Sequence, residues 1–236
     1  MRKNIIITGE PKSGKSTLLW SVVSDIPNKV GMVTKELRSG DARVGFESET
    51  HNGTTALLAH TEHETQHKVS KYFVDTQSLN TILPKISTFS EGDVLYIDEI
   101  GEMQLLSEQF KHTALQLLNS RNTCLATLTS VYDDEFTRGI KSRKDTIFVE
   151  ITAENREEKK EFIKILLKKI EKARKYSLST SLFEVHDQHS MLLTSEHGIR
   201  QLTRQNNVWS CDCEFYFKYK VCSHTIATEE LTKPKN

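Results

Sequence analysis

Residues 4–20, NIIITGEPKSGKSTLLW, decide how the N-terminal part of the chain folds. The run Ile5–Thr8 is typical of a short buried strand, and Thr17–Trp20 begins a helical pattern. Between them, Gly9–Ser16 matches the phosphate-loop pattern GxxxxGK(S/T). In this pattern glycines let backbone N–H groups turn toward phosphate oxygens, and the following helix directs the positive end of its dipole at the same anion. The stretch therefore predicts a phosphate site between a strand and a helix.

The pattern also assigns roles within this loop. Lys15 is expected to reach the β and γ phosphates, and the Ser16 hydroxyl is expected to hold a magnesium ion. The expected nucleotide-binding residues are Gly9, Glu10, Pro11, Lys12, Ser13, Gly14, Lys15, Ser16 and Thr17.

A nucleotide site built on a phosphate loop requires a carboxylate for its magnesium ion, and two acidic residues, Asp98 and Glu99, directly follow the apolar run Val94–Ile97. We expect Asp98 to orient magnesium and Glu99 to polarise an attacking water molecule. The alternative is that these acids cap the helix that follows. Thr129 and Ser130, at the end of another apolar run, are weaker candidates for sensing the γ phosphate.

Residues 4–175 alternate short β-branched runs with helical patterns, which predicts an α/β fold with a mainly parallel central sheet. The buried strands are expected at Ile5–Thr8, Val30–Thr34, Val94–Ile97, Cys124–Thr129 and Ile147–Ile151. Two further runs, Val44–Phe46 and Tyr72–Val74, are expected to be edge-like strands.

The stretch 155–175 predicts a helix that closes a first domain spanning residues 1–175. Asn155 is expected to cap its start together with Glu158. Residues 176–190 are polar and aperiodic, which predicts a linker. A second unit is expected to begin near Leu182.

The second unit, residues 182–230, is too small to be stable through apolar burial alone, so a covalent or metal cross-link is expected. The alternating segments Ser190–Thr194 and Ile199–Thr203 predict a β-hairpin. Three cysteines and a histidine then fit a closed tetrahedral zinc site. The expected zinc ligands are Cys211, Cys213, Cys222 and His224.

Aromatic residues alternate with lysines in Glu214–Lys220, between the two halves of this ligand set. Such rings could stack on unpaired bases while the lysines contact phosphates. The favoured interpretation is that they form the small core of the module.

Composition restricts the class of protein. The 236 residues carry 32 Lys+Arg and 32 Asp+Glu, so no bulk positive charge favours non-specific nucleic-acid binding. No run approaches the length of a membrane span, and the apolar stretch near the start is too short for a signal peptide. We therefore expect a cytoplasmic protein with no membrane partner.

Several segments of residues 1–172 together resemble the nucleoside-triphosphatase family typified by a thermophile nucleoside phosphatase. The segments are GEPKSGKSTLL, GMVTKELRSGDARVGFE, the run from LLAH to KYFVD, YIDEIGEMQLLSEQF and the pair Asn155-Arg156. Lys12 stands where the family often has glycine, Gln104 where it usually has glutamate, and Met32 where it usually has an aromatic residue.

The resemblance implies a RecA-like P-loop domain that hydrolyses nucleoside triphosphates to diphosphates and phosphate, with magnesium and loose base selectivity. It makes Glu99 the catalytic carboxylate, so Lys15 and Glu99 are the expected catalytic residues. Five arginines are candidates for stabilising charge in the transition state, and the sequence does not choose among them: Arg38, Arg43, Arg121, Arg138 and Arg143.

Residues 182–230 resemble a SWIM-type zinc finger, which implies nucleic-acid or protein binding without separating the two. Two other functions remain open. A P-loop nucleoside or nucleotide kinase would use the basic segment Thr137–Lys144 as a lid over phosphates, and a nucleotide-binding adaptor would bind without turnover.

Overall fold

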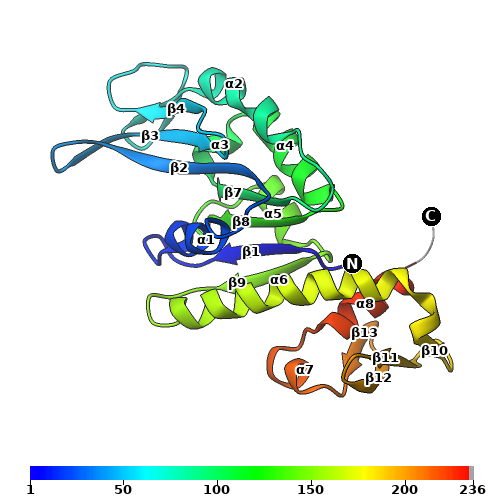
Figure 1. Cartoon of the computed structure of the whole chain (residues 1–236). Coiled ribbons are helices and arrows are strands. Elements are labelled where there is room, and N and C mark those ends of the chain that lie inside the picture. The colour runs from blue at the N-terminus through cyan, green and yellow to red at the C-terminus, as the bar shows by residue number, and fades with distance from the viewer. Residues whose placement is uncertain (234–236) are drawn as a thin grey trace. The chain divides into compact units, whose positions relative to one another are not determined.

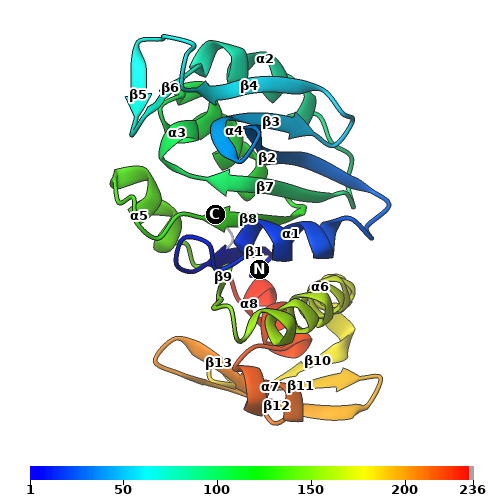
Figure 2. The same cartoon turned by 90° about the vertical axis from the view of Figure 1, so that its left-hand side faces the viewer.

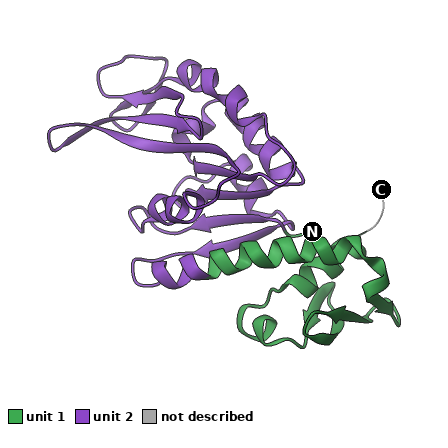
Figure 3. Ribbon diagram, viewed as in Figure 1, with its two compact units in different colours: residues 1–2, 162–236 green, residues 3–161 purple. Residues whose placement is uncertain are grey.

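The computed structural model describes residues 1–233 and divides into two compact units (Figure 1, Figure 3). The larger unit is Lys3–Glu161, and the smaller one contains Met1–Arg2 and the chain from Phe162 onward. The division falls inside the helix α6 (Arg156–Leu178). The domain ranges expected from the sequence, 1–175 and 182–230, stay a prediction. No helix within the described residues is long and apolar enough to cross a membrane.

The larger unit is built on a nine-stranded sheet in the order β5-β6-β4-β3-β2-β7-β8-β1-β9 (Figure 2). Five adjacent strands of this sheet, in the order β2-β7-β8-β1-β9, pair in parallel with their neighbours. These strands are β2 (Lys29–Ser39), β7 (Val94–Ile100), β8 (Thr123–Leu128), β1 (Asn4–Thr8) and β9 (Thr146–Glu150). The expected P-loop α/β class is confirmed for this unit, and the parallel part contains all five strands expected to be buried. The expectation was wrong for β9, which is an edge strand with two exposed residues, Phe148 and Glu150.

The other half of the sheet is antiparallel, so the expectation of a mainly parallel sheet was too simple. It contains β3 (Ala42–Thr50), β4 (Thr55–His60), β6 (Tyr72–Val74) and β5 (His67–Val69). Neither strand expected at an edge lies there: Val44–Phe46 belongs to the nine-residue internal strand β3, and Tyr72–Val74 is the internal strand β6 between β5 and β4. The last four residues of β3, Glu47–Thr50, are all polar, so no apolar pattern marks this part of the chain as a strand.

Helices cover both faces of the parallel strands. Ile6 of β1 belongs to a buried cluster with residues of α2 (Thr76–Ile86), α4 (Glu108–Asn119) and α5 (Glu135–Lys141). Ile5 and Ile7 point the other way, because successive strand residues alternate between faces, and α1 (Lys15–Val23) lies on that side. The short helix α3 (Glu102–Leu105) follows β7 directly.

The closing helix forms as expected and begins at Arg156, directly after the predicted cap residue Asn155, whose carbonyl oxygen accepts from the Lys159 N–H at 2.9 Å. The Asn155 Oδ1 accepts from the Thr152 N–H, which lies before the helix, at 2.9 Å. At the other end α6 continues to Leu178, and a 3₁₀ turn (Thr180–Leu182) leads into β10 (Phe183–Val185). The linker expected over residues 176–190 was therefore wrong, because the end of α6, the 3₁₀ turn and β10 occupy most of this stretch.

The smaller unit contains a four-stranded antiparallel sheet in the order β10-β11-β12-β13. The expected hairpin is confirmed by β11 (Ser190–Ser195) and β12 (Gly198–Gln205), with Ser195 opposite Gly198. After β13 (Val208–Cys211) come α7 (Glu214–Tyr219) and α8 (Ser223–Leu231). Buried apolar side chains of the sheet, of α8 and of the segment before it form the core of the module: Met191, Leu193, Leu202, Trp209, Val221, Ile226 and Ala227.

Candidate functional site

The loop between β1 and α1 has the backbone of a phosphate cradle. Gly9, Lys12 and Gly14 have φ values of 149°, 68° and 92°. A Cβ at Gly9 would lie 2.4 Å from the Ile151 carbonyl oxygen, so only glycine fits there. Lys12 adopts the left-handed backbone conformation at the position where the family often has glycine.

The predicted loop residues lie together, and several polar atoms of the loop point inward. Lys15 is buried, and its Nζ donates to the carbonyl oxygens of Gly9 and Glu10 at 2.9 and 3.0 Å. The Ser13 Oγ is buried and has no hydrogen-bond partner within residues 1–233. An anion held by the loop would satisfy this hydroxyl. The loop residues Glu10, Pro11 and Lys12 are exposed, as are Ser16 and Thr17 in the first turn of α1.

The end of β7 brings Asp98 against the first turn of α1. The Asp98 Oδ1 accepts hydrogen bonds from the Ser16 Oγ at 2.9 Å and from the Thr127 Oγ1 at 2.6 Å. Asp98 is only 2% exposed, and this burial raises the pKa of its carboxyl group. Adjacent hydroxyl and carboxylate oxygens are the ligands that magnesium prefers. Ser16 and Asp98, which the sequence assigned to magnesium separately, therefore fit one ion.

Glu99 follows at the edge of the same site. Burial, and then the charge of Asp98, raise the pKa of Glu99. Gly101 provides the space for this side chain, because a Cβ there would lie 2.6 Å from the Glu99 Oε1. The alternative, that these acids cap the following helix, was wrong, because the N-cap of α3 is Gly101.

Sequence reasoning missed a chain of hydrogen bonds that holds this strand end. The buried Gln104 donates from Nε2 to the Thr34 Oγ1 at 3.1 Å, and Thr34 donates to the Asp98 carbonyl oxygen at 2.8 Å. Thr127, which bonds the carboxylate itself, was also missed. These contacts depend on strand register, which no local pattern supplies. Of the two sensor candidates, Thr129 is buried, and the Ser130 Oγ donates to the Gly9 carbonyl oxygen at 3.0 Å.

The arginine that lies at the phosphate loop is not one of the five candidates. Four of the five arginine candidates pair with acids: Arg38 and Arg43 with Glu36, Arg138 with Asp133, and Arg143 with Asp145. Arg156 was not a candidate, yet its side chain packs on the phosphate loop: its Nη1 would lie 2.7 Å from a Cβ at Gly14. Its only signal in the sequence was the Asn155-Arg156 pair.

The four predicted zinc ligands also lie together. The Sγ atoms of Cys211, Cys213 and Cys222 and a ring nitrogen of His224 lie within 4.8 Å of one another, and all four residues are buried. Hydrogen bonds from Cys211, and then from Cys222, lower the pKa of the Cys213 thiol. The Cys222 Sγ accepts from the Thr225 N–H at 3.4 Å and so caps α8. Three sulfur donors and one imidazole form a donor set suited to tetrahedral zinc.

The interpretation that the α7 aromatics form the module core was wrong. No residue of α7 is buried, and Phe217 is 65% exposed. Phe215 and Tyr219 instead stack on Phe162 of α6, with ring centroids 6.5 and 4.6 Å from its ring. The core of the module is instead filled by side chains of the sheet, of α8 and of the segment before α8.

Comparison with known proteins agrees with the geometry of the larger unit. Residues 4–166 match the family model described as NTPase. The chain belongs to this family. Nucleoside-triphosphatase THEP1 of Thermotoga maritima is 34% identical over 154 residues, which cover 64% of this chain and 88% of the relative. Family membership identifies the protein as an enzyme of the nucleoside-triphosphatase class.

Two solved structures of such enzymes are similar to this fold. The crystal structure of THEP1 from Aquifex aeolicus matches with a TM-score of 0.64 and 29% identity, covering 70% of this chain and 98% of that one. The solution structure of a human cancer-related nucleoside triphosphatase matches with a TM-score of 0.60 and 29% identity, covering 70% and 97%.

Proposed function

We propose that the protein hydrolyses nucleoside triphosphates to diphosphates and phosphate in a magnesium-dependent reaction with loose base selectivity. The observation that carries this proposal is the 2.9 Å hydrogen bond between Ser16 on the phosphate loop and Asp98 at the end of β7, with Glu99 beside it. This contact joins the loop that would hold the phosphates to the strand end that would hold the metal and the water.

The roles of the residues follow from their positions. The Lys15 ammonium and the loop N–H groups counter the charge of the β and γ phosphates. Ser16 and Asp98 would hold the magnesium ion, which would supply further neutralisation of phosphate charge. Glu99 accepts a proton from water as the water oxygen bonds to the γ phosphorus. The bond from that phosphorus to the β-γ bridging oxygen breaks, and the electron pair leaves with the diphosphate.

Phosphate release measured with ATP, GTP, CTP and UTP, each with and without magnesium, tests this function. Release from all four, abolished by EDTA and by Lys15→Ala, is the expected result. Phosphate transfer to an added nucleoside faster than release would favour the kinase instead. Tight nucleotide binding without release would favour the adaptor. The basic lid that a kinase needs has little support, because Arg138 and Lys141 pair with Asp133.

We further propose that residues 182–230 form a SWIM-type zinc finger that binds nucleic acid or protein. The buried Cys/His cluster supports the zinc, with the His224 Nδ1 toward the sulfurs. For the partner, α7 offers the exposed Phe217 beside Lys218 and Lys220. If the partner is single-stranded nucleic acid, affinity falls with salt and Phe217→Ala weakens it. A protein partner would show little salt dependence. A cytoplasmic location also stays a prediction.

A further inference from the structure

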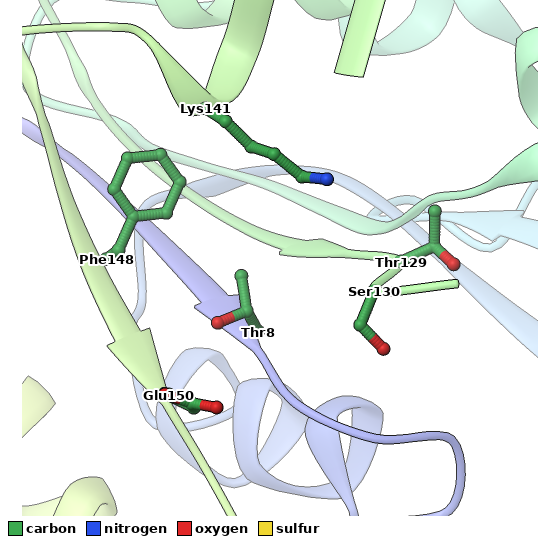
Figure 4. Close-up of a pocket in the computed structure, with 6 residues that line it drawn as sticks. All are labelled: Thr8, Thr129, Ser130, Lys141, Phe148 and Glu150. Carbon is green, nitrogen blue, oxygen red and sulfur yellow. The ribbon is translucent and has the colours of Figure 1, made fainter. Parts of the chain in front are cut away.

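A pocket of about 340 Å³ lies over the ends of β1 and β9, next to the phosphate loop (Figure 4). Its volume lies at the lower end of the range for small-molecule sites. The residues that line it come from β1, β9, α5 and the segment after β8: Thr8, Thr129, Ser130, Lys141, Phe148 and Glu150. Ser130 also donates to the Gly9 carbonyl oxygen, so the pocket and the loop share a wall.

Strand register explains why these side chains meet. Thr8 of β1 is the register partner of Glu150 of β9, and Ile6 is the partner of Phe148. Phe148 and Glu150 are two residues apart on one strand, so both point to the same face of the sheet. Figure 4 shows the Phe148 ring on one wall, with the hydroxyls and the Glu150 carboxylate below and opposite.

The sheet order gives the pocket a direction relative to the substrate. In the proposed function, the γ phosphate faces Asp98 and Glu99 at the end of β7. The strands run β7-β8-β1-β9, so β9 lies on the other side of the phosphate loop from β7. The nucleoside is the opposite end of the substrate from the γ phosphate. A nucleotide bound in this orientation would extend toward β9, along the carboxyl ends of the parallel strands, where open α/β sheets bind ligands.

The chemistry of the pocket matches a nucleobase. Phe148 is 39% exposed on an edge strand and offers an aromatic face, on which any base can stack. The Glu150 carboxylate can accept hydrogen bonds from base N–H groups. The Thr8 hydroxyl can donate or accept, and the Ser130 hydroxyl, whose proton is donated to Gly9, can accept. Stacking contributes affinity without distinguishing bases, which agrees with loose selectivity.

We infer that this pocket receives the nucleobase of the substrate, with Phe148 stacking on the base and Glu150 accepting from its N–H donors. The inference rests on the proposed function, because the direction of the nucleotide follows from the γ phosphate at Glu99. Guanine presents two adjacent N–H donors to a carboxylate and uracil presents one, so Glu150 gives a modest preference for guanine.

Binding of nucleotide and of base-free ligand separates this site from the phosphate loop. Calorimetry with magnesium gives dissociation constants for GDP, UDP and inorganic diphosphate on the full-length protein. In Phe148→Ala the dissociation constants of GDP and UDP should rise about tenfold, and that of diphosphate by less than about twofold. Phe148→Leu keeps an apolar side chain without the ring and should shift nucleotide binding in the same direction. Leu115→Ala, on α4 at 37% exposure, is the matched control and should change neither.

Glu150→Gln tests the polar contact. It should weaken GDP about fivefold while changing UDP less, because the amide replaces one of two acceptor oxygens by a donor. Unchanged GDP and UDP binding in both Phe148 variants, or a parallel loss of diphosphate, would overturn the base pocket and leave the hydrolase proposal intact. If the wild-type protein bound neither GDP nor diphosphate, the proposed function would fail, and the base pocket with it.

Discussion

Replacing Gly101 by alanine would place a methyl group against the carboxylate of Glu99. The new Cβ would lie 2.6 Å from the Glu99 Oε1 and 3.0 Å from both Cδ and Cγ. Ordinary contacts between such atoms begin near about 3.5 Å, so the carboxylate must move by about 1 Å. Gly101 has an extended backbone, φ −129° and ψ 172°, which alanine adopts without strain.

These distances predict a separation of activity from stability. The atoms in the way are the end of one flexible side chain, so the free energy of unfolding should change by less than about 1 kcal/mol. A displacement of about 1 Å in a group that orients the attacking water can lower the rate about 10²-fold. Nucleotide binding should persist, because Lys15, Ser16 and Asp98 are unchanged.

The assay combines phosphate release, nucleotide binding and thermal unfolding on Gly101→Ala. Gly139→Ala is the matched control: Gly139 lies within α5, and a Cβ there meets no atom within 4 Å, so activity should stay at the wild-type level. A Gly101→Ala protein with wild-type kcat and an intact fold would refute the placement of Glu99 as the group that activates water.

Three further predictions concern stability. Lys12→Gly should raise the free energy of unfolding by up to about 1 kcal/mol in a denaturant titration, because a side chain is unfavourable at φ 68°; a lower value would show that Lys12 makes stabilising contacts. Metal analysis should find one zinc ion per chain, and Cys222→Ser or a chelator should unfold the C-terminal module. The unfolding should appear as a loss of near-ultraviolet circular dichroism from Trp209, whereas substitution of the exposed His197 by alanine should leave the signal unchanged. A signal that resists the chelator would contradict a structural zinc site. Burial raises the pKa of Asp145, but the hydrogen bond from Arg143 and then the charge of Lys3 outweigh it and leave this pKa below its ordinary value. The ionised Asp145 should therefore stabilise the fold fully above the unfolded pKa of about 4, and this stabilisation should disappear as pH falls below it. The free energy of unfolding of Asp145→Asn should depend less on pH over that window, and an unchanged pH dependence would show that Asp145 does not have a lowered pKa.

The sequence predicted the parts of the fold that are determined by residues next to one another in the chain. The phosphate loop and β1 follow from a strand, a glycine pattern and a helix start that are contiguous in residues 4–20. The zinc ligands similarly follow from spacing within fourteen residues, Cys211 to His224. In contrast, β4 was missed and β3 was shortened. β4 contains the apolar run Ala56–Ala59 and β3 ends in the polar run Glu47–Thr50, so neither has the alternation that marks a half-buried strand, and both depend on antiparallel pairing with each other.

The remainder of the site depends on which segments become neighbours. Thr127 reaches Asp98 only because β7 and β8 pair in parallel, with Ile97 opposite Ala126. Arg156 reaches Gly14 only because β9 lies beside β1 and leads α6 past the loop. Neither contact has a sequence pattern of its own, and both involve residues more than 25 positions apart in the chain.

In the proposed mechanism Glu99 activates water for hydrolysis while other residues bind the nucleotide. Glu99→Gln keeps the shape of the side chain and removes the carboxylate, so phosphate release from GTP with magnesium by this variant separates the two roles. We predict a fall of about 10²-fold or more in kcat, with the dissociation constant of nucleotide within about threefold of wild type. Phosphate release at the wild-type rate from Glu99→Gln would show that Glu99 does not activate the water.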